Sequence, residues 1–236
     1  MKFILLISIA IAFPLVIHAQ SKNEMNIKKD VVDYYWEMSS SDKDLISYPI
    51  EMKNNKWTSV SIADYEIPAD VNYLKGYIFI SDAANDSLDK ASTFQFVIYE
   101  RKKGDPIIAI SKKRYQDDMW ATEVSFWEKK GGKWFNVIQE VAPELTYQDF
   151  LEGGRDGFKL SDALIKMLPI HYDLPTKSSE HINVYLLNDY FAYYCHQVKP
   201  DDENCGIQNA IIYDQVELRW NKTKGAFVLV NFKKST

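Results

Sequence analysis

Two stretches of the chain resemble each other, and this similarity constrains the fold more than any other feature of the sequence. YEIPADVNYLKGYIFISD, residues 65–82, aligns without a gap with YDLPTKSSEHINVYLLND, residues 172–189. The identical positions are Tyr65 and Tyr172, Pro68 and Pro175, and Asp82 and Asp189. Similarity within one chain indicates duplication of a folding unit.

A second pair of segments repeats the same order. EVSFWEKKGGKWFNVI, residues 123–138, parallels QVELRWNKTKGAFVLV, residues 215–230. Each segment predicts a strand, a turn rich in lysine and glycine, and another strand. Because two copies are too few for a solenoid, we expect two packed units or two halves of one pseudo-symmetric body.

Each copy begins with helical signals and continues with strands. Ile27, Val31, Tyr34, Tyr35 and Met38 recur at helical spacing in the first copy, in a segment that begins at Asn26 and ends in the serines at 39–41. In the second copy we expect a short helix capped by Thr146, and then a helical stripe made of Leu160, Leu164, Met167 and Leu168. The predicted strands are residues 76–81, 93–101, 106–115, 119–129, 133–141, 181–187, 190–197, 208–221 and 225–233. Strands that follow one another with short turns predict an α+β fold with two tandem related units, each a helical lead and an antiparallel β-meander.

The N-terminus predicts a secretory signal peptide. Lys2 precedes an apolar run at residues 3–17, and Ala19 provides a small residue for cleavage. The run is shorter than the roughly 20 residues of a membrane-spanning helix, which leaves an uncleaved anchor as the alternative. No later segment is apolar for long enough to span a membrane. The predicted boundary near residues 143–146 then gives this division: signal peptide 1–19, first unit 20–145 and second unit 146–236.

The charge balance bears on the kind of partner. The chain has 28 lysine and arginine residues against 33 aspartate and glutamate residues, a net charge of −5. A nucleic acid or an anionic membrane surface favours a basic partner, so we expect neither. Together with the signal peptide, this indicates a secreted or periplasmic protein whose partner is a protein or a glycan outside the cytoplasm.

Cys195 and Cys205 are the chain's two cysteines. In an exported protein a nearby pair predicts a disulfide. The competing interpretation is a nucleophile and base formed by Cys195 and His196. Neighbouring residues of a strand point to opposite faces, which disfavours that arrangement.

The segment HINVYLLNDYFAYYCHQ suggests a hairpin with its turn at Asn188-Asp189. This register places Leu186 opposite Phe191, Val184 opposite Tyr193 and Ile182 opposite Cys195, which forms an apolar core face. The other face pairs Tyr185 with Ala192, Asn183 with Tyr194 and His181 with His196. That second face is the candidate binding surface, because tyrosine rings with polar tips can stack on a sugar or anchor a protein. Its candidate binding residues are Tyr185, Tyr190, Tyr194, His181 and His196. The interpretation that we favour is that helices of the same unit cover this face and that the tyrosine hydroxyls find hydrogen-bond partners at its edge.

The opposed histidines raise the question of a metal site. His181 and His196 would share a transition metal only with a carboxylate from the loop at residues 201–203. This is not a metal-binding motif, and we expect neither a metal nor a cofactor.

The aligned strands disagree about one tryptophan. Val124 and Phe126 occupy inward positions, which turns Trp127 outward. Either a bulge re-aims Trp127, or it is an exposed aromatic residue that serves as a ligand platform beside Trp120 and Trp134. A contact between the two units is the more ordinary interpretation.

The sequence has none of the common catalytic motifs. Gly153-Gly154-Arg155-Asp156-Gly157 lacks the strand and the Lys-Ser/Thr ending of a phosphate-binding loop, and neither G-x-S-x-G nor H-E-x-x-H occurs. We therefore favour an exported non-catalytic binding protein. The alternatives are a secreted hydrolase with its site between the two units and a structural component of an envelope complex.

Overall fold

The computed structural model describes residues 29–42, 44–61, 64–82, 91–116, 119–152, 160–166, 168, 170–174, 180–200 and 202–234. The predicted signal peptide and Pro175 lie outside these residues, as do the whole glycine-rich segment at 153–157 and Met167 of the second predicted helical stripe. The fold belongs to the mixed α+β class, consists mostly of strands, and its sheets are antiparallel, as the sequence predicts.

The larger sheet has eight strands in chain order, each paired with the next. A helix, α1 (Val31–Ser41), precedes it. The strands are β1 (Ile50–Lys53), β2 (Lys56–Val60), β3 (Glu66–Asn72), β4 (Tyr77–Asp82), β5 (Ser92–Tyr99), β6 (Ile107–Gln116), β7 (Met119–Lys130) and β8 (Lys133–Asn136). The last two-thirds of this meander matches the predicted strands, whereas β1, β2 and β3 have no counterpart among them.

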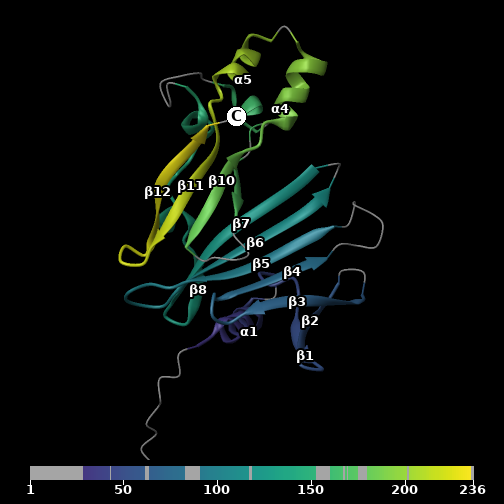
Figure 1. Ribbon diagram of the computed structural model, residues 1–236, viewed down its shortest axis with the longest axis vertical. Helices are drawn as coiled ribbons and strands as arrows, with labels where there is room; N and C mark the ends of the chain where they lie inside the picture. Colours follow the sequence, from purple (N-terminus) through teal and green to yellow (C-terminus); the bar gives the residue numbers. More distant parts are fainter. Residues whose placement is uncertain are drawn as a thin grey trace, which may run out of the picture.

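The smaller sheet has four strands in the order β12-β11-β10-β9. Its strands are β9 (Ile170–Asp173), β10 (His181–Leu186), β11 (Tyr213–Asn221) and β12 (Ala226–Lys234). Short helical segments surround it: α2 (Ile138–Val141), η2 (Tyr147–Phe150), α3 (Asp162–Ile165), α4 (Asp189–Tyr193), η4 (Tyr194–Val198), η5 (Glu203–Gly206) and α5 (Ile207–Ala210). Figure 1 shows α4 and α5 beyond one end of this sheet, far from α1.

The central strands of the larger sheet are buried on both faces. One face packs against the smaller sheet, with Tyr99 and Phe126 meeting Trp220 and Phe227. The other face packs against α1. Successive residues of β5 and β6 therefore alternate between two cores, and this explains why these strands read as continuous apolar runs.

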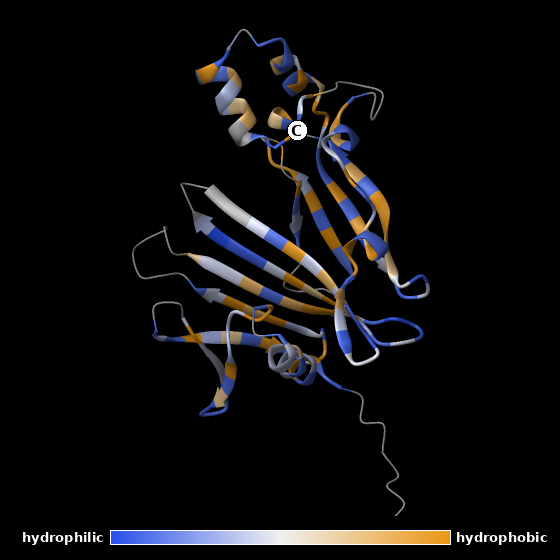
Figure 2. Cartoon of the chain, turned by 180° about the vertical axis from the view of Figure 1, so that it is seen from behind, coloured by the Kyte–Doolittle hydropathy of each residue, from blue (hydrophilic) through white to orange (hydrophobic). Residues whose placement is uncertain are grey.

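The smaller sheet is different, because only one of its faces enters a core. Along β10 the residues Ile182, Val184 and Leu186 are buried between the sheets, and the residues between them are half-buried. Figure 2 shows the corresponding alternation of hydrophobic and hydrophilic positions along these strands. The core between the sheets combines residues from both sides of the predicted boundary at 145 and 146.

Helix α1 begins later than its apolar pattern suggests. Asp30 accepts hydrogen bonds from the backbone of Val32 and Asp33, and Asp33 bonds back to the Asp30 amide, which forms a capping box. The buried face contains Tyr35 and Met38, as predicted, and Tyr34 is half-buried at its edge. Asn26 and Ile27 lie outside the described residues.

Two-residue turns set the register of two hairpins. Asn54 and Asn55 both have positive φ, 49° and 62°, and join β1 to β2 with Lys53 opposite Lys56. Gly131 and Gly132, with φ of 58° and 81°, join β7 to β8 in the same way. Both turns have the left-handed backbone that matches the twist of the flanking strands.

The internal similarity has a mixed outcome. The second match keeps its strand pairing, because Trp127 pairs with Asn136 in the first hairpin and the aligned Arg219 and Val228 pair in the second. The turns differ, since two residues close the first hairpin and residues 222–225 close the second. The first match is not preserved: Asp82 ends strand β4, whereas the aligned residue at 189 begins α4. The structure does not confirm two equivalent units.

Several predicted strands are partly or wholly helical. Residues 190–197 lie in α4 and η4, residues 207–210 form α5, and β8 ends at Asn136 because the chain turns into α2. The short helix capped by Thr146 is present as η2, where the Asp149 carboxylate accepts from the Thr146 amide at 2.7 Å. Leu164 is buried in α3, consistent with the predicted helical stripe.

Candidate functional site

Strand β10 carries the part of the predicted binding surface that the structure preserves. His181, Asn183 and Tyr185 share the face of the smaller sheet that points away from the core, as the alternation predicts. Their neighbours on β11 are Arg219, Glu217 and Gln215. The predicted core face of β10 is confirmed, but its partner strand is a different one.

The predicted hairpin at Asn188-Asp189 is wrong. The chain enters α4 at Asp189, and β11, not residues 190–197, pairs with β10. Phe191 and Cys195 are both buried, and their four-residue spacing belongs to a helix. Tyr193, predicted to face the core, is 58% exposed.

The predicted histidine pair does not form. His181 lies opposite Arg219, and His196 is exposed on η4. Within the described part of the chain, no group of three or more histidine, cysteine, aspartate and glutamate residues is arranged to hold a metal ion.

Cys195 and Cys205 form the predicted disulfide, with their Cα atoms 5.6 Å apart. The bridge joins η4 to η5, so Cys195 lies in a helical segment and not in the predicted strand at residues 190–197. Nearby, the hydroxyl of Tyr194 donates to the Asp202 carboxylate at 2.8 Å. Hydrogen bonds from Asn204 and Tyr194 lower the pKa of Asp202. Tyr194 thus helps to hold this loop and is separate from Tyr185.

Trp127 turns to the opposite face from Phe126, as predicted, but this face is not open. It packs, half-buried, against the core beneath α1, and its indole nitrogen donates to Ser125 at 2.8 Å. Trp134 packs against the same core. The side chains of Trp120 and Tyr190 are outside the described part of the structure.

A pocket of about 450 Å³ opens on the outer face of the smaller sheet around Tyr185. We call it the outer-face pocket. It is lined by Lys113, His171, Asp173, Tyr185, Leu186, Leu187, Asn188 and Asp214. These residues come from β6 of the larger sheet, from the strands β9, β10 and β11 of the smaller sheet, and from the segment after β10.

The strand register places the chemistry of this pocket. Tyr185 lies directly opposite His171, with ring centroids 6.2 Å apart. Asp173 lies two residues further along β9, on the same face as His171. Its carboxylate forms an ion pair with the Lys113 ammonium at 2.8 Å. Lys113 lies on the side of β6 that faces the smaller sheet, so this ion pair joins the two sheets at the pocket rim.

Burial and neighbouring charges act on the two aromatic groups. Burial and the Lys113 ammonium lower the pKa of His171, and Asp173 opposes this change. Burial raises the pKa of Tyr185, and the carboxylates of Asp173 and Asp214 add to the increase. Among the described residues the buried Nδ1 atom of His171 has no hydrogen-bond partner. These shifts favour the neutral forms of the His171 imidazole and the Tyr185 phenol in the pocket.

Sequence reasoning identified Tyr185 but missed Lys113, His171, Asp173 and Asp214. The IHYD segment of β9 does alternate, with His171 and Asp173 on one face. Lys113 is 60 residues from Asp173 in the chain, and no spacing rule connects them.

The comparisons with known proteins identify no family. No family model matches the chain, and no curated protein matches it. A solved domain of an uncharacterized protein from Porphyromonas gingivalis W83 is similar at 10% identity and a TM-score of 0.46, covering 78% of this chain and 79% of that one. No described helix has the length and apolar character needed to cross a membrane.

Proposed function

We propose that this chain is an exported, non-catalytic binding protein that holds a glycan in the outer-face pocket. The observation that carries the proposal is the combination around Tyr185: an aromatic ring beside His171, with carboxylate, amide and ammonium groups on the rim. An aromatic ring stacks against the C–H face of a sugar, and the polar groups bond to its hydroxyls.

Export is part of the proposal. The disulfide between Cys195 and Cys205 supports it, because disulfides persist in oxidising compartments outside the cytoplasm. The predicted signal peptide agrees with this location. A glycan suits this site, since most of the lining side chains are polar and can bond to sugar hydroxyls.

The test is glycan binding to the folded chain, measured on a glycan array and by calorimetry on the glycans that bind. Tyr185→Ala should weaken binding by about tenfold or more, because stacking and desolvation at one aromatic ring account for more than 1 kcal/mol at binding hot spots. Tyr193→Ala is the matched control, since Tyr193 is exposed on α4 and does not line the pocket. Equal binding by wild type and Tyr185→Ala would rule out this pocket.

A second function is favoured by one observation, the state of His171. Its pKa is lowered and its Nδ1 is unpaired among described residues, at a site where residues of the two sheets meet. This is the arrangement expected of a general base in a hydrolase. If the chain is a hydrolase, release of 4-nitrophenol from ester or glycoside substrates should be lost in His171→Asn and retained in His196→Asn. Absence of turnover in wild type would leave the binding function.

We also propose that the two halves descend from one module. The shared register of the β7–β8 and β11–β12 hairpins supports this. The second half would have lost a hairpin equivalent to β5–β6. Loss of two neighbouring antiparallel strands leaves the remaining strands antiparallel, so β10 can pair directly with β11. Related chains in which both halves have the same number of strands would support this descent.

A further inference from the structure

Two hairpin turns from different sheets meet at one end of the molecule. They are the β5–β6 turn, residues 100–106, and the β11–β12 turn, residues 222–225. The amide of Lys102 donates to the carbonyl of Lys222 at 2.8 Å. Arg101 lies so close to Gly225 that a Cβ at position 225 would be 2.8 Å from its Cδ, and the φ of Gly225 is +66°. The two turns are therefore held in a defined arrangement.

A pocket of about 370 Å³ lies between these turns, and we call it the basic pocket. It is lined by Arg101, Lys102, Lys103, Lys222, Thr223, Lys224 and Gly225. Five of these seven side chains are cationic, in a chain whose net charge is −5. Such a concentration of one charge on a protein of the opposite sign creates a local field that attracts anions.

The charge of Arg101 is already compensated. Its guanidinium contacts the Glu128 carboxylate at 2.5 Å and the Asp105 carbonyl at the same distance. Both partners of the ion pair are largely buried, at 17% and 13% exposed. Arg101 thus holds the pocket together, and an incoming ligand meets the lysines.

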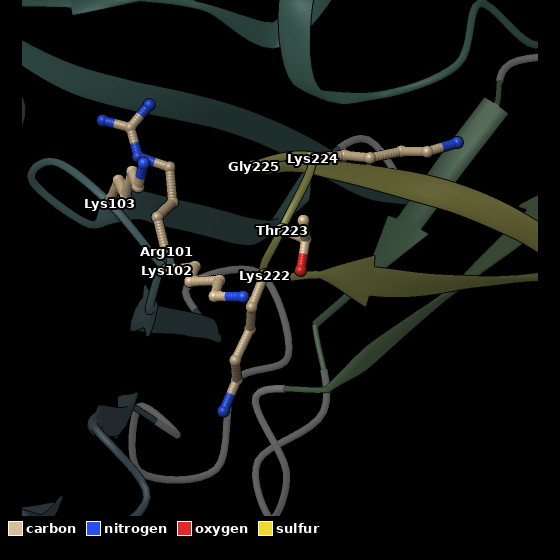
Figure 3. Close-up of a pocket in the computed structure, with 7 residues that line it drawn as sticks. All are labelled: Arg101, Lys102, Lys103, Lys222, Thr223, Lys224 and Gly225. Carbon is tan, nitrogen blue, oxygen red and sulfur yellow. The ribbon is translucent and has the colours of Figure 1, made fainter.

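The four lysines are exposed, and no described carboxylate forms an ion pair with them. Figure 3 shows that their side chains extend in different directions from the two turns, with Lys222 and Lys224 pointing away from each other. One small anion cannot contact ammonium groups that diverge in this way. A chain with repeated anionic groups can, because successive groups reach successive lysines.

We propose that the basic pocket binds an acidic polysaccharide through its sulfate or carboxylate groups. Ammonium groups form charge-assisted hydrogen bonds with such anions, and clusters of lysine and arginine are typical of heparin-like ligands. The lining has no aromatic side chain for stacking nucleic-acid bases. A membrane surface would favour a broad basic face, whereas this chain is acidic overall. The site is separate from the outer-face pocket and does not depend on its function.

The test compares two variants with the same change of charge. Lys102→Glu/Lys222→Glu alters the basic pocket. The control, Lys166→Glu/Lys234→Glu, alters two exposed lysines outside the pocket, one at the end of α3 and one at the end of β12. Calorimetry with size-defined heparin oligosaccharides should show binding by wild type and by the control. The pocket variant should bind at least about a hundredfold more weakly, from about tenfold for each charge-assisted bond lost. Binding should also weaken steeply with added salt.

Further arms separate this ligand from others. Polygalacturonate, which has carboxylates but no sulfates, shows which anionic group is bound, and neutral dextran should not bind. Equal loss in the two double variants would mean that only net charge matters and would overturn the proposal. So would binding to phosphatidylglycerol vesicles with no binding to either polysaccharide. Tyr185→Ala should retain heparin binding, which keeps this result distinct from the test of the outer-face pocket. Thermal melting of each variant confirms that it is folded.

Discussion

The two sheets of this protein differ in how many of their faces are covered. The central strands of the larger sheet are buried between α1 and the smaller sheet, so the side chains of residues 96–99 in β5 and 107–110 in β6 all belong to one core or the other. The smaller sheet has one covered face, and its other face carries His171, Asp173 and Tyr185. The part of a strand that is covered on both sides has no free position for a ligand, whereas a strand covered on one side has every second residue available.

The difference also separates stability from function. The doubly covered sheet contributes apolar burial, and substitutions there should act on folding. The outer face of the smaller sheet contributes polar groups at the surface, and substitutions there should act on binding with little effect on folding. The following predictions test this separation, beginning with the largest expected effect.

Phe96 tests the doubly covered sheet most strongly. It is fully buried in β5 and packs edge-on against Tyr35 of α1, with ring centroids 5.1 Å apart. Phe96→Ala should lower the free energy of unfolding by about 3–5 kcal/mol, because it removes apolar burial and leaves a cavity. Urea unfolding measures the change.

Phe135 is the matched control for Phe96. It lies in the edge strand β8 and is 47% exposed. Phe135→Ala should change the free energy of unfolding by only about 0.5 kcal/mol. Similar losses in the two variants would mean that burial on both faces does not distinguish the central strands from the edge.

The disulfide tests the helical end of the smaller sheet. The bridge joins two cysteines that are 10 residues apart in the sequence. Cys205→Ser should lower the free energy of unfolding by about 3 kcal/mol under non-reducing conditions, as the chain-entropy model gives for a loop of this length. With reductant present, variant and wild type should melt alike. Identical melting without reductant would show that no bridge forms.

His171 tests the outer face, where the smallest effect is expected. Because burial and Lys113 lower its pKa in the folded state, the unfolded chain binds the proton more readily. Stability should therefore fall as the pH decreases below the unfolded value of about 6.5, and level off below the folded pKa. His171→Asn should remove this part of the pH dependence in melting measured between pH 8 and pH 5.

Lys113→Met tests whether Lys113 causes part of this pH dependence. It removes the cation that lowers the pKa of His171 and leaves Asp173, which raises it. The decrease in stability at low pH should become smaller in this variant. A pH profile identical to that of wild type would show that Lys113 does not act on His171.

The alternation of β10 was predictable, and its partner was not. Ile182, Val184 and Leu186 identify a core face because side chains of a strand alternate in direction. Residues 190–197, which follow, are rich in tyrosine, and their side chains can be sorted into an apolar and a more polar strand face. The local pattern therefore favours a hairpin. The helix forms because Phe191 and Cys195 enter the core together, and the bridge to Cys205 holds the segment.

Part of the outer-face pocket was predictable in the same sense. The position of Tyr185 on the outer face followed from the alternation of side chains along β10. Outside the pocket, the disulfide between Cys195 and Cys205 followed from the number and spacing of the cysteines. The basic pocket did not follow, although the run at residues 101–103 is evident in the sequence. Its second half comes from residues 222–225, and nothing local indicates that these two turns meet.

The class of fold, most of the strands, the buried face of β10 and the cysteine pair could all be predicted from the amino-acid sequence. These properties depend on interactions between residues close in the chain, through side-chain alternation, turn residues and loop closure. Three properties became visible only in the folded chain: which strands pair across long separations, which face of each sheet is covered, and which distant side chains share a pocket. Those depend on how two sheets pack, and packing is set by the combined shape of both cores rather than by any one segment.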